Sequence, residues 1–293
     1  MPQRVQPSLA GSRLLLLAAS LCFSTGGAAI KATSLTAWQV AGFRSIVAAL
    51  SVFLLLPAAR RGWNWRVLPV GAAYAGTMLL FVLSNKLTTA ANSIFLQSTA
   101  PLYLLLLAPW LLQERIQRRD LAPIAAVAGG MALFFLGGER VVATAPNPAA
   151  GNVIAAISGI FWALTIAGIR WIARRRPAGG GTLAHIVTGN LIACMVALPM
   201  AFPAAHVTAK DWLVIVYLGV VQIGVAYACM TAGLRRVPAF EASTIMLIEP
   251  VLNPLWAWFV HGERPSALAL TGGAVIMTAT LLNAWWHSRE GST

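Results

Sequence analysis

The sequence predicts an all-α integral membrane protein in which ten transmembrane helices form two inverted five-helix repeats around a central cavity. Hydrophobic residues make up 58% of the 293 residues and charged residues only 10%, whereas charged residues are about 25% of an average soluble domain. Such a chain has too little polar surface for a water-soluble fold. Its surplus apolar surface is therefore expected to face lipid.

Ten apolar runs follow one another along the chain, each of a length, about 17 to 25 residues, that can cross a bilayer as a helix. The connections between them contain turn or charged residues, and none is long enough for a soluble domain. The longest, residues 139–150, contains Pro146 and Pro148 and is expected to join a first repeat, residues 1–145, to a second, residues 146–293. The runs cover residues 14–30, 36–57, 67–85, 89–112, 121–138, 151–172, 183–201, 212–234, 239–260 and 266–286.

Positively charged residues are unevenly divided between the two sides that this topology defines. Of the 21 Lys and Arg residues, fifteen fall on the side of the N-terminus, five on the opposite side, and Arg44 lies within a run. Because cytoplasmic segments carry the excess of Lys and Arg, both termini are predicted to be cytoplasmic. Among the five opposite residues, Lys31 and Lys86 lie near helix ends and are expected to extend to the membrane interface.

The two halves are similar at a constant offset of 149 residues around the fourth and ninth runs. The matched positions are Pro101 with Pro250, Ala108 with Ala257, and Glu114-Arg115 with Glu263-Arg264. Five helices per half is an odd number, so the second half must have the inverted orientation. Inverted repeats with a substrate site between them near the membrane midplane are typical of secondary transporters.

Prolines lie inside the matched runs of both halves. Pro101, Pro250 and Pro254 each remove a backbone hydrogen bond and are expected to kink their helices. Such interruptions occur in membranes where the backbone is buried in protein or lines a cavity, which favours a gating role. The alternative is a packing kink without any part in transport.

Charged residues within membrane spans are hypotheses of function by default. Glu249 is the deeper of two acids in the ninth run, and three roles stay open for it: binding a substrate amine, exchanging protons, and bonding the backbone near Pro250. Glu241 lies near a helix start, where an acid stabilises the helix dipole. Arg44 is expected to form an ion pair or a backbone tether between helices.

Aromatic and amide residues share helix faces in several runs, a pattern that predicts an apolar cavity with a few placed polar groups. For each residue the alternative is a packing role. The predicted cavity residues are Tyr74, Met78 and Phe81 in the third run, Asn92, Thr99 and Tyr103 in the fourth, Trp162 in the sixth, Gln222 and Tyr227 in the eighth, and Glu249, Asn253 and Trp256 in the ninth.

These features together resemble the drug/metabolite transporter superfamily, specifically its ten-helix EamA type. The motifs that carry the resemblance are Pro101 with Glu114-Arg115, and Ile248-Glu249-Pro250-Val251 with Gly262-Glu263-Arg264 and Gly272-Gly273. The resemblance covers the whole chain. It implies a central cavity lined by helices 1, 3, 4, 6, 8 and 9, with the fifth and tenth helices packed outside.

The resemblance also implies export of small metabolites across the bacterial inner membrane by alternating access. Amino acids, aromatic and other neutral ones, are the leading expectation, because exporters of aromatic amino acids are among the similar proteins. Export of multiple drugs or lipophilic cations, or of another metabolite class such as nucleobases or sugars, remains the alternative.

Other classes of function find little support in the sequence. The chain has no HExxH, GxSxG or phosphate-loop motif, and its three cysteines form no CxxC pair, so no enzyme activity, metal or cofactor is expected. The net charge of +13 comes from Arg residues in short loops, which indicates membrane topology and not nucleic-acid binding. The expected partners are a small-molecule substrate and the lipid bilayer, and no obligatory protein partner is indicated.

Overall fold

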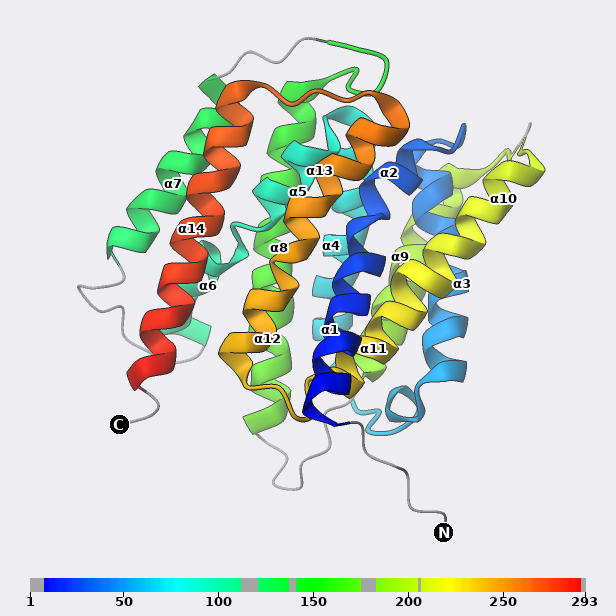
Figure 1. Ribbon diagram of the computed structural model, residues 1–293. Helices are drawn as coiled ribbons and strands as arrows, with labels where there is room; N and C mark the ends of the chain where they lie inside the picture. The colour runs from blue at the N-terminus through cyan, green and yellow to red at the C-terminus, as the bar shows by residue number, and fades with distance from the viewer. Residues whose placement is uncertain (1–7, 112–120, 137–140, 175–182, 205–206, 291–293) are drawn as a thin grey trace.

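The computed structural model describes residues 8–111, 121–136, 141–174, 183–204 and 207–290, and this part of the chain contains no β-strand (Figure 1). Within it, nine helical segments are long and apolar enough to cross a membrane, and the helix Leu121–Leu136 is apolar but shorter. The predicted all-α membrane fold with ten apolar helical segments is confirmed. The Glu114-Arg115 motif lies outside the described residues.

The first half contains seven α-helices and one short 3-10 helix among its described residues. They are α1 (Leu9–Ser24), α2 (Gly26–Lys31), α3 (Ala37–Leu55), η1 (Pro57–Arg60), α4 (Val67–Leu87), α5 (Ala90–Gln97), α6 (Ala100–Leu111) and α7 (Leu121–Leu136). The second half contains seven α-helices and one π-helical segment among its described residues. They are α8 (Pro148–Arg174), α9 (Ala184–Ala201), α10 (Ala209–Val216), η3 (Tyr217–Val225), α11 (Ala226–Gly233), α12 (Ala239–Met246), α13 (Ile248–His261) and α14 (Ala267–Glu290).

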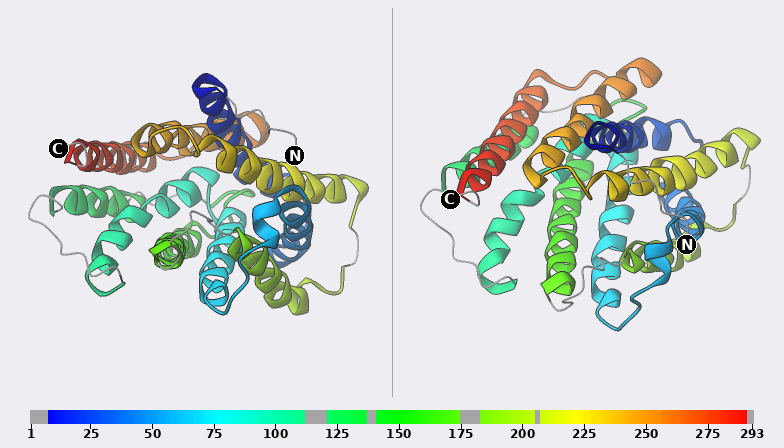
Figure 2. Two further views of the ribbon diagram at one scale, coloured as in Figure 1. Left: turned by 90° about the horizontal axis from the view of Figure 1, so that it is seen from below. Right: turned by 60° about the horizontal axis from the view of Figure 1, so that its bottom comes forward.

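The helices form two layers, which Figure 2 shows in the view from below. One layer contains α1, α10 to α14 and the segment η3, and the other contains α3, α4 and α6 to α9. Helix α1 begins and α14 ends at the same edge of the molecule, which we call the terminal end. The opposite edge, with Lys31, Ala90 and His261, is called the distal end.

Two of the spanning segments are broken where the sequence predicts kinks. Helix α5 ends at Gln97, ahead of Pro101, and α6 begins at Ala100. The hydroxyl of Ser98 donates to the Ile94 carbonyl (2.7 Å) and that of Thr99 to the Leu96 carbonyl (2.6 Å). These bonds satisfy carbonyls at the helix end, and Pro101 lies in the first turn of α6, where a missing N–H costs little. The expected kink is therefore a full break.

The second half repeats this arrangement in the ninth span. Helix α12 ends at Met246, and Pro250 lies in the first turn of α13, whereas Pro254 lies inside that helix. The sequence pattern did not predict two further interruptions. The first span is broken at Thr25, whose hydroxyl donates to the Cys22 carbonyl (2.8 Å), and the eighth span contains the π-helical segment η3.

Helices α7 and α14 pack against each other through glycines. A Cβ atom on Gly130 would lie 2.9 Å from the Gly272 carbonyl oxygen, and one on Gly272 would lie 2.6 Å from the Gly130 carbonyl oxygen. Only glycine permits backbones to approach this closely. This pair joins the two layers at one side of the molecule (Figure 1).

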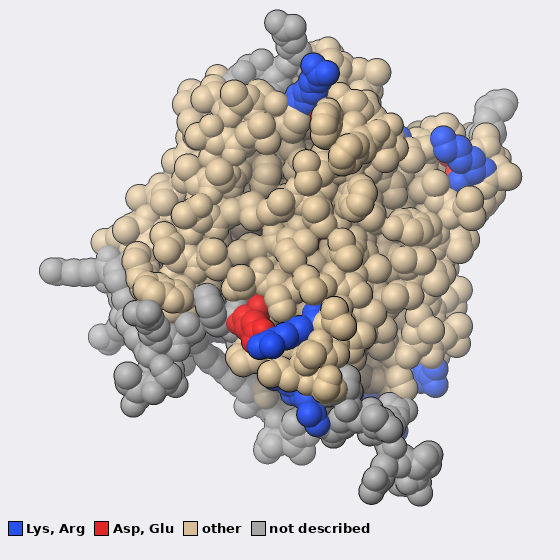
Figure 3. Space-filling model, in the orientation of Figure 1, with Lys and Arg blue, Asp and Glu red and all other residues tan. Residues whose placement is uncertain are grey.

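The outer surface of the layer that contains α1, α12 and α14 has a broad central band without Lys, Arg, Asp or Glu (Figure 3). Charged side chains on this face lie toward the two ends. A band of this kind suits the hydrocarbon core of a bilayer, because charges are costly at that depth.

Candidate functional site

A cavity of about 460 Å³ lies between the two layers. Its lining is mainly apolar and aromatic, with a few polar and charged side chains, as in sites for small molecules. One wall comes from α3, α4, α5, α6 and α8, and the other from α1, η3, α11, α12, α13 and α14. Ten α-helices and the segment η3 thus contribute to the wall.

The broken helices reach the cavity at their interruptions. Residues Gln97, Ser98 and Pro101 line it from the α5–α6 break, and Met246 and Pro250 line it from the α12–α13 break. Non-helical backbone at membrane depth is tolerated where it lines a cavity or is buried in protein. The two matched proline positions therefore lie at the cavity, while Pro254 is not in its wall.

Seven of the predicted cavity residues lie in its wall. They are Tyr74, Met78, Phe81, Trp162, Gln222, Tyr227 and Glu249. Their rings pack against one another: the ring centroids of Tyr74 and Tyr227 are 6.3 Å apart, and those of Phe23 and Tyr227 are 5.2 Å apart. The cavity thus holds a group of aromatic side chains from both layers.

The other five predicted residues are not in the cavity wall and lie between helices or at helix ends. Asn92 donates to the Asn152 side chain (2.9 Å) and Trp256 to the Ser24 hydroxyl (2.9 Å). Thr99 caps its own helix end, and the Tyr103 hydroxyl faces the Met131 sulfur (3.8 Å). Asn253 is fully buried at Gly27, where a Cβ atom would lie 2.5 Å from its Oδ1.

Sequence reasoning missed the place of Arg44 in the cavity wall. Arg44 is 1% exposed, and its Nη2 donates to the Met78 carbonyl (3.2 Å), so the predicted backbone tether is present. The guanidinium also lines the cavity, and its Nε has no hydrogen-bond partner. A charged residue in a span was the available signal, but it does not reveal which way the side chain points. Thr280 adds a contribution from the tenth helix, which was expected to pack outside.

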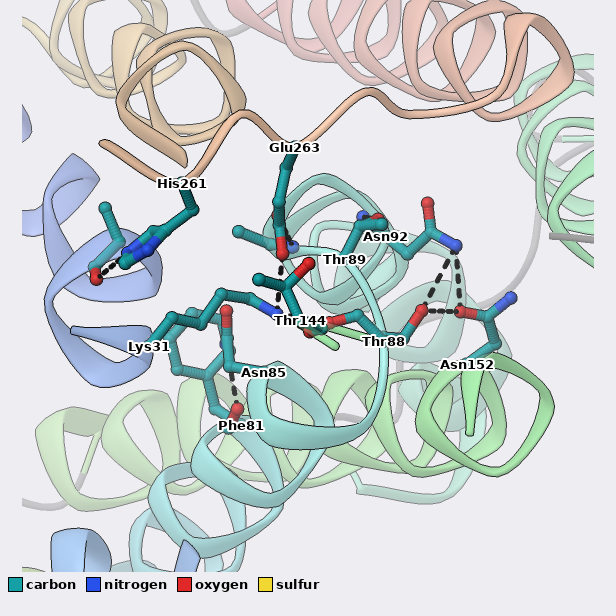
Figure 4. Close-up of polar contacts among 12 residues, drawn as sticks. Lys31, Phe81, Asn85, Thr88, Thr89, Asn92, Thr144, Asn152, His261 and Glu263 are labelled. Atoms are coloured by element: carbon teal, nitrogen blue, oxygen red, sulfur yellow. Dashed lines mark hydrogen bonds and ion pairs between the residues drawn. The ribbon is translucent and has the colours of Figure 1, made fainter. Parts of the chain in front are cut away.

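An ion pair joins the two halves at the distal end (Figure 4). The Lys31 Nζ lies 2.8 Å from the Glu263 carboxylate, and these side chains are only 3% and 2% exposed. Lys31 also donates to the Thr88 carbonyl (2.8 Å) and to that of Thr144, while Glu263 accepts a bond from the Ala90 N–H (2.9 Å) at the start of α5. The expectation that Lys31 extends to the membrane interface is wrong, because this buried carboxylate neutralises it.

Further polar contacts surround this pair. The Asn152 Oδ1 accepts bonds from Thr88 (2.8 Å) and Asn92 (2.9 Å), as Figure 4 shows, and its Nδ2 donates to the Phe134 carbonyl (3.0 Å). His261 bonds to the Ala28 carbonyl (2.8 Å). Hydrogen bonds therefore join the two halves at the distal end.

Two more polar contacts lie at the distal end. The Asp211 carboxylate accepts bonds from the Ser34 N–H (2.9 Å) and the Ser34 hydroxyl (2.8 Å), which joins the start of α10 to the loop before α3. Lys86 also contacts this loop, because its Nζ donates to the Thr33 carbonyl (2.9 Å).

The terminal end is joined across the halves by a different kind of pair. Arg13 of α1 contacts Glu241 in the first turn of α12, with side chains 47% and 33% exposed. Glu241 lies near a helix start as predicted, and Arg13 is its ion-pair partner. Nearby, the Ser20 hydroxyl donates to the Ile245 carbonyl (3.1 Å). Among the residues that the structure describes, no group of three His, Cys, Asp or Glu side chains could hold a metal ion.

Several known proteins resemble this chain in sequence or in fold over most of its length. It is 25% identical over 291 residues to the aromatic amino acid exporter YddG of Ancylobacter novellus, which covers 94% of this chain and 98% of that protein. It is 23% identical over 220 residues to an uncharacterized transporter of Clostridium kluyveri, covering 71% and 67% of the two chains. A solved crystal structure at 19% identity has a TM-score of 0.62 and covers 96% of this chain and 99% of that chain, which shows a common fold.

A protein-family model gives the assignment. The model described as the EamA-like transporter family matches residues 12–136 and residues 149–285. These two stretches include the broken helices at the cavity and the ion pair at the distal end. The protein, a multi-pass membrane protein with a central cavity, therefore belongs to the EamA-like transporter family.

Proposed function

We propose that the protein is a secondary transporter that exports neutral amino acids, aromatic ones included, across the bacterial inner membrane by alternating access. The observation that carries the proposal is the cavity of about 460 Å³ between the layers, lined by aromatic rings, in a molecule whose halves are joined by polar contacts at the distal end (Figure 4). Its volume suits a single small metabolite. The similarity to an aromatic amino acid exporter over nearly the whole chain supports the choice of substrate class.

The direction of the closure follows from the charge distribution. With the termini in the cytoplasm, as the excess of Lys and Arg predicts, the distal end faces the outside of the cell. The conformation described here then excludes the exterior from the cavity. Export requires that the distal contacts part after substrate has entered from the cytoplasmic side.

The proposed moving units are the two inverted repeats, residues 1–145 and 146–293. The breaks at Ser98 and Leu247 lie at matching places in the two halves and both border the cavity. Helix segments that meet at such breaks are able to change their mutual angle without loss of regular helical hydrogen bonds. We propose that α6 and α12 swing relative to α5 and α13 during transport.

Counterflow in proteoliposomes tests this function. Liposomes that contain the purified protein are loaded with one unlabelled amino acid, and uptake of labelled phenylalanine or threonine is followed. We expect accumulation well above that of protein-free liposomes. Failure of every amino acid to support counterflow, with protein that is monodisperse and folded, contradicts the proposal.

A matched pair of tryptophan variants links transport to the cavity. Trp162→Ala removes a ring from the cavity wall and is expected to lower phenylalanine counterflow about fivefold, because an aromatic contact is worth roughly 1 kcal/mol. Trp286→Ala removes a ring that is 41% exposed on α14 and is expected to leave counterflow unchanged. Equal effects of the two changes would contradict the placement of substrate.

One observation favours a second candidate, an exporter of lipophilic cations. Glu249 presents a carboxyl group beside the rings of the cavity, and aromatic rings with a carboxylate bind organic cations well. Titration calorimetry with tetraphenylphosphonium and with phenylalanine distinguishes the two candidates. Binding of tetraphenylphosphonium together with no binding of any neutral amino acid would favour the cation exporter.

A further inference from the structure

We propose that Arg44 and Glu249 bind the two charged groups of an α-amino acid, the carboxylate at Arg44 and the ammonium at Glu249. The inference rests on the proposed function, because it assigns these residues to the substrate of the same cavity. It explains why the cavity contains two opposite charges that do not neutralise each other.

Arg44 carries a positive charge that the described residues leave unneutralised. The side chain is 1% exposed, and no described carboxylate lies within 4.0 Å of its guanidinium, since the two ion pairs found there involve Arg13 and Lys31. Its contacts are to the carbonyl and the sulfur of Met78, and its Nε makes no hydrogen bond. A buried guanidinium in this state favours an anionic ligand, and its planar fork matches a carboxylate.

Glu249 is the corresponding acid on the opposite wall. It lies in the first turn of α13, directly after the break, and lines the cavity. No Lys or Arg of the described residues lies within 4.0 Å of its carboxylate. A carboxylate without a cationic partner at membrane depth favours a ligand that brings an ammonium group.

Two tyrosines line the same cavity as the charged groups. Tyr74 of α4 and Arg44 of α3 belong to the first half of the chain, and Tyr227 of α11 and Glu249 of α13 belong to the second half. The two rings pack against each other with centroids 6.3 Å apart and an interplanar angle of 63°. The cavity therefore contains one charged group from each half, in a wall whose two sides this tyrosine pair joins.

An α-amino acid carries its carboxylate and its ammonium on the same carbon atom, so a single small ligand supplies a partner for each of the two unpaired groups. Its side chain then lies among the rings of Phe23 and Trp162, which line the same cavity. A site built to bind a charged group rejects an analogue that lacks it, because the protein group stays buried and unpaired. Zwitterions are therefore preferred over plain amines and plain acids.

Equilibrium binding to the purified full-length protein in detergent tests the assignment. The probes are phenylalanine, phenethylamine, which lacks the carboxylate, and 3-phenylpropionate, which lacks the ammonium group. Titration calorimetry avoids passive leakage of the two analogues through liposomes. For the unaltered protein we expect phenylalanine to bind roughly 10- to 100-fold more tightly than either analogue.

The variants separate the two ends of the substrate. In Arg44→Gln, the affinities for phenylalanine and phenethylamine are expected to lie within about threefold of each other, while 3-phenylpropionate still binds weakly. In Glu249→Gln, the affinities for phenylalanine and 3-phenylpropionate are expected to lie within about threefold of each other, while phenethylamine still binds weakly. Arg235→Gln and Glu241→Gln remove an exposed arginine and a second acid of the ninth span, neither of them in the cavity wall. These controls should keep the preferences of the unaltered protein.

Arg44→Lys covers the case in which Arg44→Gln does not fold. The lysine keeps the positive charge, so the protein should still prefer phenylalanine to phenethylamine. Because the lysine lacks the planar fork of a guanidinium, phenylalanine should bind more weakly than to the unaltered protein. Unchanged ratios in the Arg44 and Glu249 variants, or equal binding of the three probes by the unaltered protein, overturn the inference even when phenylalanine counterflow succeeds. Loss of counterflow with every amino acid instead overturns the proposed function, and the inference with it.

Discussion

The distal and terminal ends of this transporter are each joined across the two halves by an ion pair, but the surroundings of the pairs differ. At the distal end, Lys31 and Glu263 are 3% and 2% exposed and are held by backbone groups of three loops and helix ends. At the terminal end, Arg13 and Glu241 are 47% and 33% exposed. The same kind of ion pair is therefore buried at one end and exposed at the other.

This difference determines how much each end resists separation. A buried pair is costly to break from one side, because the remaining charge stays out of water without compensation. An exposed pair is screened by solvent and contributes little. We call the distal contacts the distal lock, and we expect them to resist separation more strongly than the exposed pair at the terminal end.

The largest expected effect comes from breaking the distal pair on one side. Glu263→Ala leaves Lys31 buried without its carboxylate and removes the acceptor at the start of α5, so we expect a loss of about 3–5 kcal/mol in the free energy of unfolding. Thermal unfolding of the purified protein in detergent measures it. The double variant Lys31→Met/Glu263→Met should recover most of the loss. If Glu263→Ala were as stable as the original protein, the buried ion pair would not be what holds the distal end together.

Close packing beside the lock gives the next effect. A Cβ atom on Gly27 would lie 2.5 Å from the Asn253 Oδ1 and 2.9 Å from the Ala90 Cβ, which belong to different halves of the chain. Gly27→Ala is expected to cost about 1–3 kcal/mol of unfolding free energy, because the neighbouring helices must move apart to admit the methyl group. Gly129→Ala is the matched control, since nothing lies within 4 Å of its Cβ position. Equal melting temperatures of the two variants would refute the tight packing.

The smallest effect is expected at the terminal end. Glu241→Gln removes the partner of Arg13 in an exposed pair, so the melting temperature should not change measurably. The comparison with Glu263→Ala uses one chain and one assay, and it contrasts a buried ion pair with an exposed one. A loss of stability as large as that of Glu263→Ala would show that both ends are locked.

The membrane spans were predictable because their signal is local. A run of about twenty apolar residues indicates a membrane-spanning helix by itself, independently of the rest of the chain. The breaks were only partly predictable. Pro101 and Pro250 marked two of them, but the break at Thr25 depends on a hydroxyl bond to its own helix, and the π-helical segment η3 leaves no pattern of its own.

The distal lock was not predictable, because its partners are far apart in the chain. Lys31 meets Glu263, and Asn92 meets Asn152, only after the two halves have packed together. A helix face with polar residues predicts that the face is buried, but it does not say against what. For this reason the sequence predicts all of Asn92, Trp256, Tyr74 and Tyr227 in the cavity wall, although only the two tyrosines lie there.

A reversible cross-link at the distal end tests the central claim, that this end must open for transport. In a variant in which Cys22, Cys194 and Cys229 are replaced, Ala28→Cys and His261→Cys put one thiol in each half where the His261 ring meets the Ala28 carbonyl. Treatment with a short bifunctional methanethiosulfonate should abolish amino-acid counterflow, and reduction should restore it. Single-cysteine variants treated in the same way should stay active. Full counterflow by the cross-linked protein would contradict the account.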